Sequence, residues 1–316
     1  MNILITGSVG FIGYHLVKEL SKTKNKIFGC DNLSSNSKKT QKNRLKLLKK
    51  NKKFFYKKID LKKYQTFSNY YKSKKIDIII HLAAQPGVRI SQEKPLQTID
   101  QNIKTFTNLM EFCKNYKIKH FFYASSSSIY GNESKFVEKQ LLKKVSSIYA
   151  ASKVCNEVFA NVYHFLYGIN TLGLRFFTVY GELGREDMAY YKFLKQIKKN
   201  NEITIYGDKK SARSFTYIDD VVHSILLLIN KFSKKKKYND YINIGNIEKN
   251  SLNDLIKIIK KHYKNNFKEK FLKRNKADVF KTQSSILKLK QNINYFPKTK
   301  LEFGMKKFIK WFKEFD

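Results

Sequence analysis

The sequence opens with an apolar stretch, residues 2–6, that runs directly into three glycines spaced three residues apart, Gly7, Gly10 and Gly13. A strand that enters a helix through such a turn lets the main chain approach a phosphate group at the helix N-terminus. This order of strand, glycine-rich turn and helix is typical of dinucleotide-binding α/β folds. We therefore expect a bound dinucleotide, contacted by Gly7, Gly10, Phe11, Ile12 and Gly13.

The first 176 residues alternate between short apolar runs and longer segments with helical spacing. The runs predict strands at 2–6, 26–30, 53–57, 76–82, 119–124 and 170–176, and the longer segments predict helices at 11–22, 38–50, 92–117 and 147–167. Such alternation is typical of parallel strands joined by crossover helices. The fold class predicted is α/β, a Rossmann-type doubly wound parallel sheet followed by a smaller C-terminal α/β substrate region.

A domain boundary is expected near residue 176. Beyond it the pattern predicts helices at 188–199, 219–229, 252–262 and from 301 onward, with strands near 203–205 and 241–244. We assign residues 1–176 to the cofactor-binding domain. Residues 177–316 are expected to form mainly the substrate region, with a segment at about 215–245 returning to the first domain.

An acidic residue, Asp31, follows the second predicted strand. A carboxylate at this place accepts hydrogen bonds from the adenosine ribose and repels a 2′-phosphate, so we predict NAD rather than NADP. Asp60 follows the third strand, where it would either reach the adenine or serve as a helix N-cap. The other residues expected to contact NAD are Asn32, Leu61, Leu82, Ala83, Ala84 and Phe176.

Tyr149 and Lys153 are one helical turn apart, so the ammonium group can lie near the phenol oxygen and favour its ionised form. The same spacing recurs by chance elsewhere, but this pair begins a helical pattern shortly after a strand that ends in a serine cluster. We predict that Tyr149 removes a hydroxyl proton as hydride leaves the same carbon. Ser126 would hydrogen-bond that oxygen, and Lys153 would also hold the nicotinamide ribose.

Several segments together resemble the extended short-chain dehydrogenase/reductase superfamily, in its nucleotide-sugar epimerase branch. They are residues 7–13, 81–89, 125–131, 149–153, 175–181, 213–221 and 243–246. Within that branch, residues 84–89 and 184–189 most resemble the UDP-glucuronate 4-epimerases. The resemblance implies that C4 of a UDP-uronate is oxidised, that the 4-keto sugar rotates in the pocket, and that hydride returns to its opposite face.

Arginine is rare here, and a planar guanidinium binds a carboxylate or phosphate with two parallel hydrogen bonds that lysine cannot reproduce. The resemblance implies that Arg213 binds the diphosphate of the UDP-sugar. We expect Arg185 near the uronate or the diphosphate, and Arg89 on the sugar side. Arg44, within a lysine-rich helix, is expected to be solvated, and Arg175, at the end of an apolar strand, to be structural.

A 4-keto uronic acid is a β-keto acid, which loses carbon dioxide unless its carboxylate is held out of alignment. Ser127, Ser128 and Thr178 are expected to hold it through hydroxyl hydrogen bonds. Related dehydratases and decarboxylases typically carry an acid at one of the positions of Ser127 and Ser128. Both residues are serine here, and the lack of an acid disfavours dehydration and decarboxylation. The resemblance also places Asp278 at the uridine ribose.

Several alternatives remain open at this point. A UDP-glucose or UDP-N-acetylhexosamine 4-epimerase would use the same Ser126, Tyr149 and Lys153, and Arg185 is the feature that discriminates against it. A UDP-glucuronate decarboxylase or a nucleotide-sugar dehydratase is disfavoured. An alternative from another class is a binding or regulatory protein that has kept NAD and lost catalysis. The intact set of Ser126, Tyr149 and Lys153 disfavours it.

The formal net charge of +39 invites a nucleic-acid interpretation. However, 58 of the 64 basic residues are lysine, and they are spread along the chain. Nucleic-acid-binding proteins concentrate their charge on one face and add a recognition module. We therefore expect a solvated surface and no nucleic-acid partner.

The sequence also gives expectations about location and assembly. It begins with a strand, without the regions of a signal peptide, and it has no apolar run long enough to span a bilayer, so a cytoplasmic protein without membrane insertion is expected. Cys30, Cys113 and Cys155 lack metal-ligand spacing and predict reduced thiols and no metal site. The resemblance implies a homodimer formed through 92–117 and 147–167, and suggests a role in surface-polysaccharide biosynthesis.

Overall fold

The computed structural model describes residues 1–34, 38–131, 136–139, 145–263, 266–273 and 280–315. Within these residues, parallel strands form a central sheet in the order β11-β6-β5-β4-β1-β2-β3. The sheet confirms the predicted Rossmann-type α/β fold. Its strands are β1 (Asn2–Thr6), β2 (Lys26–Asp31), β3 (Phe54–Lys58), β4 (Ile78–His81), β5 (His120–Ser126), β6 (Asn170–Phe176) and β11 (Asn239–Ile244).

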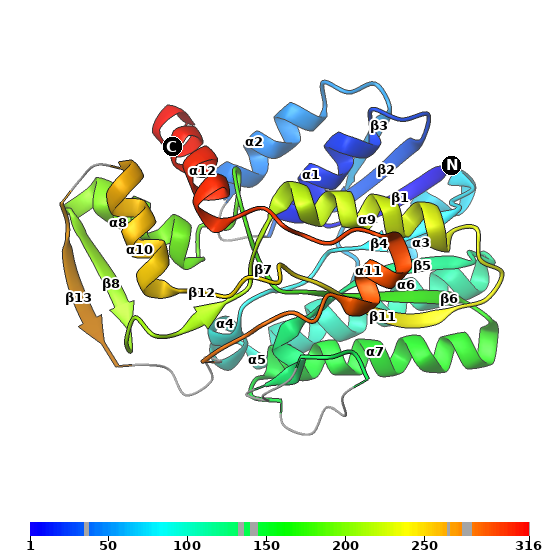
Figure 1. Cartoon of the computed structure of the whole chain (residues 1–316). Helices are drawn as coiled ribbons and strands as arrows, with labels where there is room; N and C mark the ends of the chain where they lie inside the picture. The colour runs from blue at the N-terminus through cyan, green and yellow to red at the C-terminus, as the bar shows by residue number, and fades with distance from the viewer. Residues whose placement is uncertain (35–37, 132–135, 140–144, 264–265, 274–279, 316) are drawn as a thin grey trace.

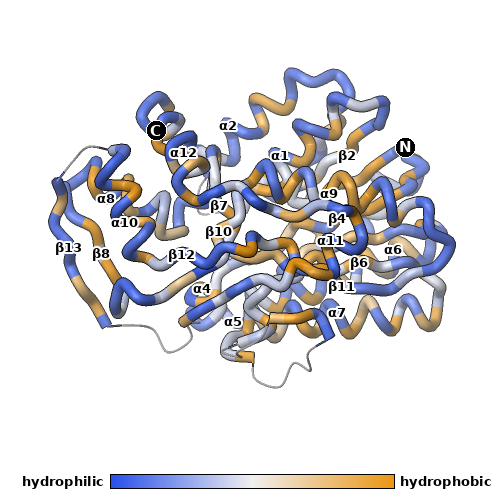
Figure 2. Tube along the Cα trace, viewed as in Figure 1, coloured by the Kyte–Doolittle hydropathy of each residue, from blue (hydrophilic) through white to orange (hydrophobic). Residues whose placement is uncertain are grey.

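Helices cover both faces of the sheet (Figure 1). Successive strand residues point to opposite faces, so Ile3 and Ile5 belong to one hydrophobic cluster and Leu4 to the other. The first cluster includes side chains of α1 (Phe11–Leu20), α2 (Lys38–Leu48) and α9 (Ile218–Phe232), and the second those of α3 (Tyr64–Tyr71), α6 (Thr105–Asn115) and α7 (Ile148–Tyr167). These helices alternate between hydrophobic and hydrophilic residues along their length (Figure 2).

The single helix expected over 92–117 is wrong. The chain forms α4 (Val88–Glu93), α5 (Pro95–Ile99), a π-helical segment (Asp100–Lys104) and α6. Proline lacks an N–H and disfavours helical geometry in the residue before it, and Lys94 accordingly has φ −133° and ψ 64°. Pro95 therefore starts a new helix at an angle to the preceding one. Helix α3 has no counterpart among the predicted elements.

The C-terminal third adds smaller elements beside the sheet (Figure 1). Strand β8 (Glu202–Tyr206) pairs with β13 (Lys268–Leu272) near the helices α8 (Ala189–Asn200) and α10 (Leu252–Tyr263). The other short elements of this third are β7 (Thr178–Tyr180), β9 (Ala212–Arg213), β10 (Phe215–Tyr217), β12 (Asn250–Ser251), α11 (Leu287–Ile293) and α12 (Leu301–Phe315). Two short helical turns lie earlier in the chain, η1 (Lys72–Lys74) and η3 (Ser127–Tyr130). β11 joins the main sheet beside β6. The division into two domains at residue 176 stays a prediction.

The glycine-rich turn packs too closely for side chains at its key positions. Gly7 has φ +68°, and a Cβ there would lie 2.6 Å from the Ala83 nitrogen. A Cβ at Gly13 would lie 2.1 Å from the Gly7 carbonyl oxygen, which accepts a hydrogen bond from the Gly10 nitrogen. The absence of side chains thus keeps the turn open in front of α1.

We expect Gly13→Ala to lower the free energy of unfolding by about 1–3 kcal/mol, because the new methyl group must displace the main chain of the turn. The same displacement should reduce the amount of dinucleotide that co-purifies. Urea unfolding followed by circular dichroism, with cofactor quantified after acid release, measures both. Gly168→Ala, at a helix end with no atom within 4 Å of the added Cβ, should retain the cofactor. Full cofactor retention by Gly13→Ala would contradict this account of the turn.

Candidate active site

A cavity of about 490 Å³ lies where the carboxyl ends of the sheet strands meet the C-terminal region. Such a volume suits a small-molecule ligand, and this edge is where doubly wound sheets bind theirs. The residues predicted from the sequence that line it are Gly7, Gly10, Phe11, Ile12, Gly13, Asp31, Asn32, Leu61, Leu82, Ala83, Ala84, Ser126, Ser127, Ser128, Tyr149, Lys153, Phe176, Thr178, Arg185 and Arg213. The fold thus brings the expected cofactor and reaction residues into one space.

Among the described residues, two predicted site residues, Asp60 and Arg89, do not line the cavity. The Asp60 carboxylate accepts a hydrogen bond from the Lys62 nitrogen, and because α3 begins only at Tyr64, its helix N-cap interpretation is wrong. The Arg89 guanidinium lies 4.1 Å from the centre of the Tyr206 ring. Asp278 falls outside the described residues.

The cavity contains the three predicted reaction residues. Ser126 ends β5, where its Oγ accepts a hydrogen bond from the Ser128 nitrogen at 3.2 Å. Tyr149 and Lys153 lie in the first turns of α7, and Ser147 caps this helix by accepting from the Ala150 nitrogen. The Lys153 Nζ is 5.9 Å from the centre of the Tyr149 ring and donates to the Ala124 carbonyl at 2.8 Å.

Burial controls the protonation of this centre. Desolvation raises the pKa of Tyr149, while a hydrogen bond with Ser126 and the positive charge of Arg185 act in the opposite direction. Desolvation also lowers the pKa of Lys153 to about 8, and the Glu157 carboxylate opposes that shift. The sequence predicts that Lys153 lowers the pKa of Tyr149, but in the protein alone burial dominates and the pKa is raised. The charge that opposes this rise is that of Arg185.

A second cation thus lies at the reacting centre. The Arg185 guanidinium donates to both oxygens of Asp187, at 3.0 and 2.6 Å. Burial favours the neutral form of each group, yet their mutual attraction raises the pKa of Arg185 and lowers that of Asp187. Both residues line the cavity that Tyr149 also lines, and the charge of Arg185 acts on the Tyr149 phenol.

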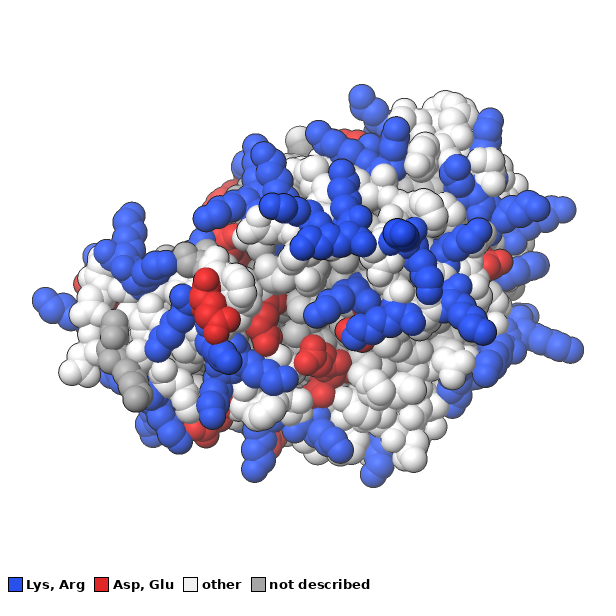
Figure 3. Space-filling view, turned by 90° about the horizontal axis from the view of Figure 1, so that it is seen from above, with Lys and Arg blue, Asp and Glu red and all other residues white. Residues whose placement is uncertain are grey.

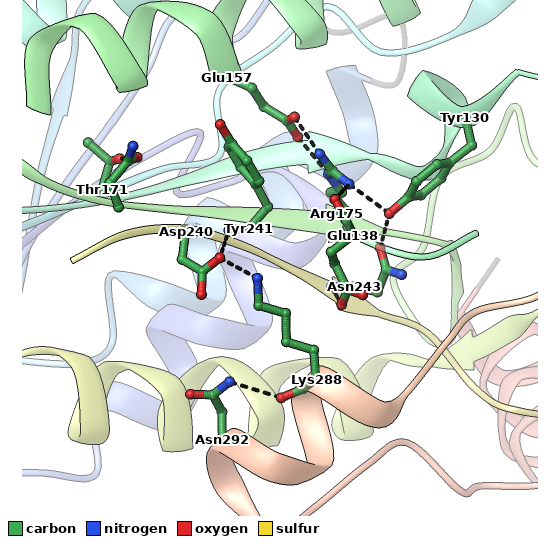
Figure 4. Close-up of polar contacts among 11 residues, drawn as sticks. Tyr130, Glu138, Glu157, Thr171, Arg175, Asp240, Tyr241, Asn243, Lys288 and Asn292 are labelled. Atoms are coloured by element: carbon green, nitrogen blue, oxygen red, sulfur yellow. Dashed lines mark hydrogen bonds and ion pairs between the residues drawn. The ribbon is translucent and has the colours of Figure 1, made fainter. Parts of the chain in front are cut away.

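A buried polar network joins β6, α7 and β11 beside the cavity-forming ends of the strands (Figure 4). Arg175 on β6 donates to both oxygens of Glu157 on α7, at 2.9 and 2.7 Å, and both side chains are at most 4% exposed. Burial would lower the pKa of Arg175, but Glu157 raises it above its usual value. The same guanidinium donates to the Tyr130 hydroxyl, which in turn donates to Asn243 on β11. Arg175 is thus structural, as the sequence predicted.

This network reaches the reaction residues directly. The Ser125 hydroxyl, next to Ser126, donates to the Glu157 carboxylate at 2.6 Å. Glu157 follows Lys153 by one helical turn on α7. Glu157 therefore joins the serine-bearing end of β5 to α7, one turn after Lys153 and two turns after Tyr149.

Arg44 corrects the sequence interpretation. It is 4% exposed rather than solvated, and it lines the cavity. Its guanidinium donates to the carbonyls of Val9, Leu183 and Gly184. Burial lowers the pKa of Arg44 to about 10.

The cavity suits NAD at its adenosine end. Gly7, Gly10 and Gly13 leave room for a pyrophosphate before α1, and the Asp31 carboxylate lies in the wall at the end of β2. Arg44, the neighbouring cation, directs its guanidinium toward main-chain carbonyls. A 2′-phosphate would therefore meet the negative charge of Asp31.

The described part of the chain contains no group of three or more His, Cys, Asp and Glu side chains that could hold a metal ion. The described helices include none both long and apolar enough to cross a membrane.

A Rossmann-type sheet with a glycine-rich turn and a Ser, Tyr and Lys centre at its carboxyl edge defines a dehydrogenase-type nucleotide-dependent enzyme. Comparison with known proteins gives the family: the profile of the NAD dependent epimerase/dehydratase family matches residues 3–245. The chain belongs to this family.

Individual relatives match over nearly their full length. A protein of Methanocaldococcus jannaschii whose name assigns no function is 42% identical, over 99% of this chain and 96% of its own. A UDP-glucuronate 4-epimerase of Thermodesulfobacterium geofontis is 38% identical, over 98% and 96%. The structure of a Bacillus cereus UDP-glucuronic acid 4-epimerase with UDP-glucuronic acid and NAD superposes with a TM-score of 0.93, at 32% identity and complete coverage of both chains.

We expect Glu157→Gln to lower the free energy of unfolding by about 3–5 kcal/mol, because it leaves the buried Arg175 charge without its counter-ion. Urea unfolding measures this loss. Glu302→Gln is the matched control, since Glu302 pairs with Lys261 and His262 at the water-exposed surface and should leave the stability almost unchanged. Equal effects of the two substitutions would show that the buried pair does not stabilise the fold.

Proposed function

We propose that this protein is an isomerase that interconverts UDP-glucuronate and UDP-galacturonate by reversible epimerisation at C4, with NAD as its bound cofactor. The observation that carries the proposal is the junction of a glycine-lined cofactor cavity with Ser126, Tyr149, Lys153 and Arg185. The two UDP-glucuronate 4-epimerases that match over nearly the whole chain support the same reaction.

NAD would lie along the wall formed by the glycine-rich turn and the ends of β2 and β4. Gly7, Gly10, Phe11, Ile12 and Gly13 would contact the pyrophosphate, and Asp31 and Asn32 the adenosine ribose. Leu61, Leu82, Ala83, Ala84 and Phe176 would supply the apolar surface. When bound, NAD accepts hydride from the sugar carbon and returns it.

The chain's own residues move the proton. Tyr149 would take the C4 hydroxyl proton and return one to the opposite epimer, with Ser126 holding the same oxygen. Because burial raises the pKa of Tyr149, its ionised form needs positive charge nearby. Arg185 supplies such charge in the protein. Lys153, whose pKa of about 8 leaves it mostly protonated at neutral pH, would hold the nicotinamide ribose.

The sugar carboxylate would be held by the hydroxyls of Ser127, Ser128 and Thr178, which line the cavity. These side chains lie on η3 and β7, immediately beyond the strand ends that carry Ser126 and Phe176. Holding the carboxylate there would keep its C–C bond out of line with the C4 carbonyl of the keto sugar. Arg213, which also lines the cavity, is proposed to bind the diphosphate.

One observation favours a second candidate, a 4-epimerase of neutral UDP-hexoses. Both guanidinium contacts of Arg185 described above go to Asp187, so a uronate would have to compete with that carboxylate. A neutral sugar requires no such exchange. The two candidates share Ser126, Tyr149 and Lys153 and differ only in the substrate accepted.

Proton NMR of UDP-glucuronate with the purified protein and no added cofactor tests the proposal, with UDP-glucose in a parallel tube. We expect UDP-galacturonate to appear in the first tube only. Tyr149→Phe should fold normally and lose about a hundredfold or more in rate, because the base is removed and the ring remains. Conversion of UDP-glucose alone would assign the neutral-sugar reaction, and a UDP-pentose product would show that the carboxylate is not protected.

We also propose a homodimer, formed through α7 and the helices before it. Val158, Val162 and Phe165 form a stripe on α7 at helical spacing, and all three are exposed, Phe165 to 85%. Leu96 and Ile99 on α5 are exposed as well. An apolar stripe of this kind on a water-exposed helix is typical of a protein interface.

We therefore expect sedimentation equilibrium to give a dimer, and the double substitution Val162→Glu with Phe165→Glu to give a monomer. Charges buried without partners at an interface cost far more than the lost apolar contact. Phe303→Glu, at an exposed phenylalanine on α12, should remain dimeric. A wild-type monomer, or a dimer that survives both glutamates, would disprove this interface.

The remaining proposals concern the setting of the reaction. We propose a cytoplasmic enzyme that supplies UDP-galacturonate for polysaccharide synthesis; the three cysteines are free thiols, which suits a reducing compartment. Lysines and arginines are scattered over the face seen in Figure 3, interspersed with acidic residues, rather than gathered in one patch. This distribution supports the expectation of no nucleic-acid partner.

A further inference from the structure

Helix α2 carries one buried stripe on an otherwise lysine-rich surface. Its buried residues are Thr40, Gln41, Arg44 and Leu48, and the first and third are one helical turn apart. Neither α2 nor its stripe belongs to the reaction centre. The stripe instead lies between the cofactor turn and the loop that carries Arg185.

On one side the stripe contacts the cofactor wall. The Arg44 Nη1 donates to the Val9 carbonyl of the glycine-rich turn at 3.2 Å. The Gln41 Nε2 lies 3.5 Å from the Asp31 carboxylate, and Gln41 itself lines the cavity. The position of α2 is thus tied to both parts of the cofactor wall.

On the other side the stripe holds the 183–187 loop. Arg44 donates to the Leu183 carbonyl from Nε at 3.1 Å and from Nη2 at 2.5 Å, and to the Gly184 carbonyl at 2.8 Å. The Thr40 hydroxyl donates to Glu186 Oε1 at 2.5 Å, and Glu186 also pairs with Lys195 of α8. Arg185 lies between these two points of attachment.

The loop needs such support. Leu183 has φ +51°, a left-handed conformation that a branched residue adopts only when its surroundings impose it. Two of the Arg44 hydrogen bonds end on the carbonyl of this residue. Loss of the guanidinium would therefore allow the loop to relax and Arg185 to move away from Tyr149.

We propose that Thr40 and Arg44 are positioning residues, which hold the 183–187 loop against the cofactor turn and so keep Arg185 beside Tyr149 while the keto sugar is in the site. The contact chain is continuous from Val9 through Arg44 to Gly184, with Thr40 and Glu186 as a second tie. The consequence for the reaction rests on the proposed 4-epimerase function, whereas the attachment of the loop does not.

The first test is hydrogen exchange of the holoenzyme, with and without Thr40→Val and Arg44→Lys. Thr40→Val keeps the side-chain shape and removes a hydrogen bond to a charged group, so amides of residues 182–188 should exchange about tenfold faster. Arg44→Lys should have the same or a larger effect, because lysine cannot span the Val9, Leu183 and Gly184 carbonyls. Lys42→Gln, an exposed position on the same helix, should exchange like wild type.

The second test is absorbance at 340 nm during turnover of UDP-glucuronate. A loosened loop should let the keto sugar escape before hydride returns, so reduced cofactor should accumulate in Thr40→Val and Arg44→Lys but not in Lys42→Gln. A residue that only stabilised the fold would leave this signal unchanged.

The two tests separate the two proposals. Faster hydrogen exchange of the loop in Thr40→Val and Arg44→Lys supports the attachment, whatever reaction the protein catalyses. Failure of the wild-type protein to epimerise UDP-glucuronate would contradict the proposed reaction and leave the attachment standing. If wild type epimerises UDP-glucuronate while both folded variants exchange and turn over as wild type does, the positioning role is overturned.

Discussion

The ion pair between Arg175 and Glu157 is the interaction on which the reaction centre depends. Both charges are almost fully buried, and neither could remain there without the other. The pair joins β6 to α7, and through the Ser125 hydroxyl it also joins the end of β5. Since Lys153 and Tyr149 lie one and two turns before Glu157, the pair sets how both side chains face the serine-bearing end of β5.

The same burial that makes the pair necessary shapes the chemistry above it. Desolvation raises the pKa of Tyr149 and lowers that of Lys153 to about 8, so both groups are driven toward their neutral forms. Glu157 opposes this at Lys153, and Arg185 opposes it at Tyr149. One acidic and one basic residue outside the Ser, Tyr and Lys centre therefore set the charges with which it works.

Much of this could be predicted from the sequence, and the failures have physical reasons. The parallel sheet follows from the period of the apolar runs and from the glycines, whose close packing at Gly7 and Gly13 no other residue allows. The broken helix at Lys94 was signalled by Pro95 and overlooked. Arg44 could not be recognised as buried, because its helix is lysine-rich and its carbonyl partners Leu183 and Gly184 lie about 140 residues away in sequence. The pairing of Arg185 with Asp187 joins residues two positions apart, so the sequence could have predicted it. The effect of Arg185 on the Tyr149 pKa depends on how distant segments fold together, and the sequence could not predict it.

The central claim is that C4 is oxidised and then reduced by the same hydride within one closed site. UDP-glucuronate labelled with deuterium at C4, converted in ordinary water and analysed by NMR and mass spectrometry, tests it most directly. The account predicts that UDP-galacturonate retains the deuterium at C4 without incorporating solvent hydrogen. Replacement of the label by a proton would contradict it, because inversion would then proceed through deprotonation and reprotonation of the carbon.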